Sequence, residues 1–149
     1  LPTGDPFASA APPDVPVPQL SNIDAQYFHA MRAGDDEAAW KAVVNYPAGA
    51  DGGRDEMARQ SAELRLALIY LQQGRHDEAA RIFTEFRAAG VSNRWKDDHG
   101  QAGEAVLESL RGDPNRSKLS IEALDRKGAK LDAKLTAFLN EARARNQRK

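Results

Sequence analysis

The feature that most constrains this chain is the stretch Glu63–Ala89, ELRLALIYLQQGRHDEAARIFTEFRAA, in which apolar residues recur at spacings of three and four. Leu64, Leu68 and Leu71 therefore share one face of a helix. Gly74 ends that helix, because glycine is favoured just after a helix C-terminus. The segment that follows carries an apolar stripe of its own, formed by Ala79, Ile82, Phe83 and Phe86. The stretch is predicted to form a helical hairpin.

Length and composition place the chain among single-domain globular proteins. Its 149 residues, 41% hydrophobic and 29% charged, can bury a core without disulfides or metals. It has no cysteine, which excludes thiol nucleophiles and thiolate-bound metals and leaves cytoplasm and periplasm both open as compartments. No apolar run approaches the roughly 18 residues of a membrane-spanning helix, so no membrane insertion of this segment is expected.

Two parts of the chain are distinguished by composition. Six of the eight prolines lie between Pro2 and Pro18, so residues 1–20 are predicted to be an extended linker to a further N-terminal region. Residues 21–149 are predicted to be one helical domain, because no strand-length segment alternates with a period of two. Its expected units are hairpins over 21–46 and 55–89, a third pair of helices over 92–116 and a C-terminal segment over 117–146. That last segment is either one long amphipathic helix or two helices with a break near Gly128.

Residues that favour helix termini and turns predict where individual helices begin and end. The first helix is expected to begin after Ser21 or Asn22 and to end before Gly34, and Ser92 is the expected cap of the third pair. Gly112-Asp113-Pro114 is expected to break the chain after that pair's first helix.

The two hairpins share one plan. When Gly34 is aligned with Gly74, Ala39 falls on Ala79 and Val43 on Phe83. The second hairpin resembles a tetratricopeptide repeat (TPR), whose pattern is matched by Leu66, Ala67, Tyr70, Gly74, Ala79, Phe83 and Phe86. The first hairpin departs from it at Ala30 and Val43. A third unit with Gly112 as its turn would place Glu104 and Glu108 at positions that should be buried, so the third pair is either a degenerate repeat or a pair of packing helices.

The resemblance implies a right-handed α-α superhelix with a long C-terminal capping helix and a concave groove lined by the first helix of each hairpin. Carried over by position, the exposed lining would be Asp24, Phe28, Met31, Arg32, Leu64, Leu68, Leu71 and Gln72. This mostly apolar lining predicts a non-enzymatic module that binds a peptide or helix, as part of a larger protein or assembly. A second interpretation has the C-terminal helix filling the groove, and the sequence leaves both open.

The charges support a different alternative. Residues 1–110 carry a net charge of −7 and residues 111–149 a net charge of +6. The basic C-terminal part could bind nucleic acid or another anionic surface through Lys118, Arg126, Lys127, Lys130, Lys134, Arg143, Arg145, Arg148 and Lys149. Aromatic residues are not interleaved with these charges, so a solvated face is favoured over nucleic-acid binding.

No sequence motif predicts catalysis or cofactor binding. The chain has no phosphate-binding glycine loop, nucleophile elbow or zinc-protease signature, so no enzyme activity and no cofactor are expected. His29 has no second ligand at helical spacing, and His76 lies in the hairpin turn. Asp97, Asp98 and His99 are consecutive, and consecutive residues of a helix point about 100° apart, so no metal site is expected there.

Overall fold

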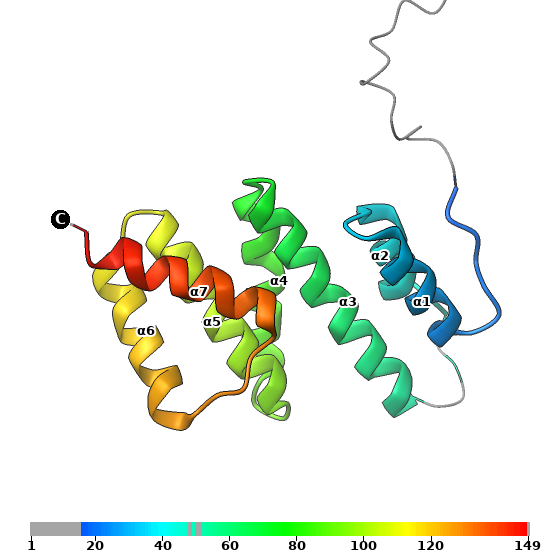
Figure 1. Cartoon of the computed structure of the whole chain (residues 1–149). Helices are drawn as coiled ribbons and strands as arrows, with labels where there is room; N and C mark the ends of the chain where they lie inside the picture. The colour runs from blue at the N-terminus through cyan, green and yellow to red at the C-terminus, as the bar shows by residue number, and fades with distance from the viewer. Residues whose placement is uncertain (1–15, 48, 50–51, 149) are drawn as a thin grey trace, which may run out of the picture.

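The computed structural model describes residues 16–47, 49 and 52–148, and the first fifteen residues of the expected linker over 1–20 lie outside them. The described residues form seven helices and no strand, which confirms the all-α class (Figure 1). The helices are α1 (Ile23–Ala33), α2 (Glu37–Val44), α3 (Gly52–Gln72), α4 (His76–Ala89), α5 (Arg94–Leu110), α6 (Pro114–Lys127) and α7 (Ala133–Asn146). Each helix packs against the next one along the chain.

The first hairpin, α1 and α2, is closed by local hydrogen bonds. The Asn22 side chain accepts from the Ala25 amide at 2.8 Å and caps α1, as expected. Gly34 has a φ of 71°, in the left-handed region that favours glycine. The indole Nε1 of Trp40 donates to the Gly34 carbonyl oxygen at 2.7 Å, which ties α2 back to the turn.

The sequence predicted an ordered fold from Ser21 onward, but the ordered fold begins before that residue. The buried side chain of Gln26 accepts from the Leu20 amide at 2.8 Å and donates to the Pro18 carbonyl at 3.1 Å. The Tyr46 hydroxyl donates to the Leu20 carbonyl at 2.6 Å. Residues 18–20 therefore belong to the first hairpin, because buried side chains satisfy their backbone groups.

The second hairpin, α3 and α4, follows the prediction closely. Gly74, with a φ of 74°, separates the two helices, and α3 begins at Gly52, three residues before the expected start at Asp55. Helix α3 is buried on several sides, since Leu64, Leu66, Leu68, Ile69 and Leu71 are all at most 5% exposed. It lies at the centre of the fold, between the first hairpin and α4.

The third pair of helices differs from the prediction at both boundaries. Asn93 caps α5 in place of Ser92, because its side chain accepts from the Lys96 amide at 3.1 Å. Helix α6 starts at Pro114, a position that suits proline, and runs through the expected boundary between residues 116 and 117. Gly128, with a φ of 60°, then ends α6. The C-terminal segment is accordingly two helices, and the first of them completes the hairpin begun by α5.

The closest helix contact joins α4 to α5 through two glycines. A Cβ added at Gly103 would lie 2.3 Å from the ring of Phe83, and one added at Gly100 would lie 2.9 Å from the Phe83 carbonyl oxygen. Glycine in a helix interior costs about 1 kcal/mol relative to alanine. Here the two glycines let the backbone of α5 rest on a fully buried phenylalanine.

Two glutamates of α5, expected at buried positions, are half-buried. Glu104 lies 3.7 Å from Arg87, and Glu108 lies 3.4 Å from Arg116. Burial raises the pKa of both carboxyl groups. The arginines on α4 and α6 thus give these two charges partners at the edges of the third hairpin.

Helix α7 crosses α5 and runs away from α3, with its N-terminal end nearest to α3 (Figure 1). Asp132 caps it by accepting from the amides of Lys134 at 2.9 Å and Leu135 at 3.3 Å. Its buried residues are Leu135, Leu139, Ala142 and Asn146. This placement brings the C-terminal part of the chain over the side of the molecule where the groove was predicted.

Candidate functional site

The residues predicted to line the groove separate into two groups. On α1, Phe28 is 65% exposed, Met31 is 50% exposed and Arg32 is exposed, while Asp24 is half-buried. On α3, Leu64, Leu68 and Leu71 are only 3%, 4% and 5% exposed, and Gln72 alone of the predicted α3 residues is exposed. The expectation that these three leucines form an exposed lining is therefore wrong, because they belong to the hydrophobic core.

The C-terminal segment covers part of the α3 surface. Leu64 shares a cavity wall with Leu131, and Leu71 shares another with Phe138. Leu131 and Phe138 are partly buried against the core. The segment from Gly128 onward thus occupies some of the space that the resemblance assigned to an open groove.

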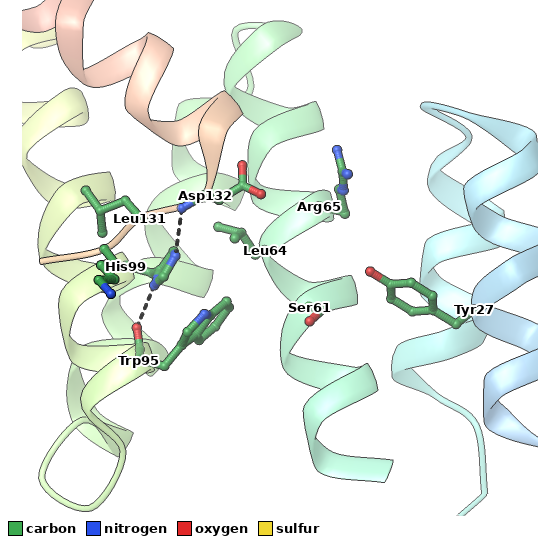
Figure 2. Close-up of a pocket in the computed structure, with 9 residues that line it drawn as sticks. Tyr27, Ser61, Leu64, Arg65, Trp95, His99, Leu131 and Asp132 are labelled. Atoms are coloured by element: carbon green, nitrogen blue, oxygen red, sulfur yellow. Dashed lines mark hydrogen bonds between the residues drawn. The ribbon is translucent and has the colours of Figure 1, made fainter. Parts of the chain in front are cut away.

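A cavity of about 410 Å³ remains between α1, α3, α5 and the segment 128–132 that links α6 to α7 (Figure 2). We call it the central cleft. It is lined by Tyr27, Ser61, Leu64, Arg65, Trp95, His99, Lys130, Leu131 and Asp132. Only Leu64 among the predicted groove residues reaches it. The other residues come from four separate segments, and no local sequence pattern indicates that they meet.

One wall of the central cleft is an aromatic stack of the partly buried Trp95 on the buried His99. The ring of Trp95 lies parallel to that of His99 with centroids 4.0 Å apart, and it meets Phe86 edge-on at 5.7 Å. On the opposite wall, Tyr27 packs edge-on against Trp40 at 5.3 Å. These contacts anchor the walls in the core, so both aromatic surfaces have fixed positions.

His99 joins α5 to the segment 128–132. Its Nδ1 lies 2.7 Å from the carbonyl oxygen of Trp95, and its Nε2 lies 3.1 Å from the amide nitrogen of Asp132 (Figure 2). A carbonyl only accepts and an amide N–H only donates, so the proton must be on Nδ1 and the ring must be neutral. Burial lowers the pKa of His99, which is 1% exposed. The neutral ring therefore fixes one side of the central cleft.

Four polar side chains of the central cleft have no internal hydrogen-bonding or ion-pair partner. These are the hydroxyls of Tyr27 and Ser61, the guanidinium of Arg65 and the ammonium of Lys130, none of which makes such a contact with the residues that the structure describes. The guanidinium carbon of Arg65 lies 5.8 Å from the ring of Trp40, a contact that leaves its N–H groups unused. The cleft thus presents several free donors next to fixed aromatic walls.

A second cavity, of about 590 Å³, lies among α3, α5, α7 and the turn between α1 and α2. Leu71, Val106, Leu110 and Phe138 contribute its apolar lining. Lys134 lies 3.9 Å from Asp35 and connects α7 to that turn. Lys134 and Arg145 thus have internal partners, whereas Gln72, His76 and Glu141, which also line this cavity, make no side-chain hydrogen bond or ion pair with a described residue.

The basic residues of the C-terminal part do not form one free surface. Four of the nine residues predicted to form it have internal partners: Lys127 lies 2.6 Å from Asp98, Arg143 lies 2.7 Å from Asp125, Lys134 lies 3.9 Å from Asp35, and Arg145 donates to the Ser109 hydroxyl at 2.9 Å. Lys118, Arg126, Lys130 and Arg148 are left without an ion pair to any described residue. Lys118 and Arg126 lie on α6, Lys130 lies in the segment 128–132 and Arg148 follows α7. The geometry gives the nucleic-acid alternative no additional support.

The acidic and histidine residues considered at the start of α5 are directed to different partners. Asp98 contacts Lys127, Asp97 contacts Arg87 at 3.3 Å, and His99 bonds to backbone atoms. Within the described ranges, no group of three or more such side chains is placed to hold a metal ion. A separate search of the same residues found no helix with the length and hydropathy needed to cross a membrane.

Comparisons with protein-family models, with curated proteins and with solved structures gave no significant match to this chain. What the chain binds therefore has to be inferred from its own side chains.

Proposed function

We propose that this chain is a non-enzymatic, TPR-like helical module that binds a segment of a protein partner in the central cleft. One observation carries the proposal: side chains from α1, α3 and the segment 128–132 that line one cavity of about 410 Å³ carry hydrogen-bond donors without a partner among the described residues. Binding sites are commonly concave, of roughly 300–1,000 Å³, with aromatic walls and a few convergent polar groups. The central cleft has these properties.

The repeat interpretation gains support from the turns. Gly34, Gly74 and Gly112 have φ values of 71°, 74° and 85°, and each separates the two helices of a hairpin. In this interpretation α1–α2, α3–α4 and α5–α6 are three repeats of a right-handed superhelix, and α7 caps the last one. Helices α1, α3 and α5 would then be the first helices of their units, and all three contribute to the central cleft.

An extended peptide suits this surface better than a small substrate does. Its backbone carbonyl oxygens can accept from the Tyr27 and Ser61 hydroxyls, and its side chains can contact the aromatic walls. Met31 lies four residues after Tyr27, on the same side of α1, and half of its surface is exposed. It therefore extends the contact surface beyond the cleft for residues that flank the bound segment.

The direct test is to fill the cleft and measure peptide capture. The chain is panned against a library of displayed random peptides, and the recovered peptides are measured by fluorescence anisotropy against the Ser61→Trp variant. Ala88→Trp, at an exposed position of α4, is the matched control. We expect Ser61→Trp to abolish binding and Ala88→Trp to retain it, with both variants helical by circular dichroism. Recovery of no peptide, or equal binding by both variants, would reject the proposed function.

A further inference from the structure

We infer that the bound segment carries a side-chain oxyanion, a carboxylate or a phosphoryl group, which Arg65 binds and the positive charge of Lys130 attracts. This inference rests on the proposed function and specifies its ligand. It follows from the balance of donors, acceptors and charges in the central cleft.

Donors without partners outnumber acceptors without partners in the cleft. The guanidinium of Arg65 and the ammonium of Lys130 can only donate, and the Tyr27 and Ser61 hydroxyls can also donate. Both ring nitrogens of His99 are already used, one toward Trp95 and the other toward Asp132. A ligand that satisfies this set must bring acceptors, and an oxyanion brings the most acceptor positions per atom.

The acidic residue of the cleft does not neutralise Arg65. Asp132 lies in the same lining, but its Oδ2 accepts from the amides of Lys134 and Leu135 at the N-terminus of α7. No oxygen of Asp132 lies within 4.0 Å of the Arg65 guanidinium, because the pair is not among the ion pairs of the described residues. The carboxylate is stabilised by the helix N-terminus, which leaves Arg65 and Lys130 without a countercharge.

The position of Arg65 favours an oxyanion over a backbone carbonyl. Its side chain is half-buried on α3 and its guanidinium is near Trp40, so the charge is partly removed from water without an anionic partner. A guanidinium binds carboxylate or phosphate through two parallel N–H···O bonds, whereas one carbonyl oxygen cannot use both donors in this way. Lys130 is exposed on the segment 128–132 and adds a second positive charge from the other side of the cleft.

The experiment uses three peptide libraries that differ only at one fixed central position, which is glutamate, phosphoserine or glutamine. The whole chain and the charge-reversal variant Arg65→Glu/Lys130→Glu are compared for the amount of each library retained. The matched control is Arg81→Glu/Lys118→Glu, which reverses one helical arginine and one lysine that are exposed and away from the cleft.

We expect the wild-type chain to retain the glutamate library, the phosphoserine library or both at least roughly tenfold better than the glutamine library, as a charge-assisted hydrogen bond implies. The charge-reversal variant should lose this preference, and the control should keep it. The library with the larger gain identifies the oxyanion. Arg65→Gln, which removes the charge without introducing a new one, should also lose most of the preference.

The outcomes separate the inference from the proposed function. Equal retention of all three libraries, blocked by Ser61→Trp, would overturn oxyanion recognition and leave peptide binding in place. A preference that survives Arg65→Glu/Lys130→Glu would also overturn the inference, because the oxyanion would bind elsewhere. Retention of none of the libraries would reject both.

Discussion

The contact between α4 and α5 and the contact between α1 and α3 differ in how closely the helices approach. Helices α4 and α5 share the most extensive contact of any pair in the described residues, and Gly103 leaves no space for a Cβ above Phe83. Helices α1 and α3 share only limited contact, and the central cleft opens between them. We call the part around α4 and α5 the close-packed half and the part around α1 and α3 the looser half. The first supplies stability, and the second has side chains with unused hydrogen-bond donors.

The largest expected effect compares two phenylalanines, one from each half. Phe83→Ala should lower the free energy of unfolding by about 3–5 kcal/mol, because it removes a fully buried ring from the contact of α4 with α5. Phe28→Ala, at a position 65% exposed, should change it by less than about 0.5 kcal/mol. Urea unfolding followed by circular dichroism measures both. Similar losses for the two variants would show that the halves do not differ in packing.

A smaller effect is expected from overpacking the same contact. Gly103→Ala should lower the free energy of unfolding by about 1–3 kcal/mol, since the new methyl group would lie 2.3 Å from the Phe83 ring. In a Phe83→Ala background the clash is absent, and the same change should be neutral or stabilising by up to about 1 kcal/mol through helix propensity. A double-mutant cycle in urea measures this reversal of sign. If Gly103→Ala lowered the free energy of unfolding equally with and without Phe83, the clash with the Phe83 ring would not be the cause.

The contact of α5 with the segment 128–132 should respond to pH through His99. Burial lowers the pKa of His99 in the folded state, so below pH of about 6.5 the unfolded chain takes up a proton that the folded chain does not. Stability should therefore fall as the pH drops from about 6.5, until the pH passes below the folded pKa. His99→Gln keeps an acceptor for the Asp132 amide but does not titrate.

Unfolding free energies at a series of pH values, compared between wild type and His99→Gln, isolate this contribution. The comparison is necessary because burial raises the pKa of Glu63, Glu104 and Glu108, and carboxyls with a raised folded pKa add stability as the pH falls. These glutamates are present in both proteins and cancel in the difference. A difference that does not change between neutral pH and pH of about 5 would show that His99 is not neutral and buried in solution.

The smallest expected change in stability is at the cleft itself. Arg65→Gln should alter the free energy of unfolding by less than about 1 kcal/mol, because its described contact is with the Trp40 ring at 5.8 Å. The matched control is Arg75→Gln, which removes an ion pair to Glu37 that connects the first two hairpins and an ion pair to Glu78 within the second hairpin. Urea unfolding should show a larger loss for Arg75→Gln. A greater loss for Arg65→Gln would indicate a structural role and weaken its assignment to ligand binding.

Prediction from sequence was most successful where the signal is local. The caps at Asn22, the turns at Gly34 and Gly74 and the second hairpin follow from spacing and from the conformational freedom of glycine. For residues 117–146 the sequence left open one long helix or two helices with a break near Gly128, and the structure has two helices. The apolar spacing across 117–146 continues through Gly128, but the backbone there adopts the left-handed conformation and ends α6.

The predicted groove shows the same difference between what a local pattern predicts and what long-range packing decides. Periodicity identified Leu64, Leu68 and Leu71 as one apolar face but could not tell an open surface from a core, because both require the same pattern. Their burial depends on where α5 and the segment 128–132 lie, which is a property of long-range packing. Phe28 and Met31 on α1 are exposed, because no described element covers that side of α1 in the same way.

By itself the sequence determined the all-α class and the hairpin turns, because helix periodicity, capping residues and glycine act within a few positions. The tertiary structure alone decided that Gly103 meets Phe83, that the leucines of α3 are buried, and that Tyr27, Ser61, Arg65 and Lys130 line one cleft. Those relations join residues far apart in the chain. They depend on how whole helices pack, and neither composition nor spacing encodes that packing in a form that can be read locally.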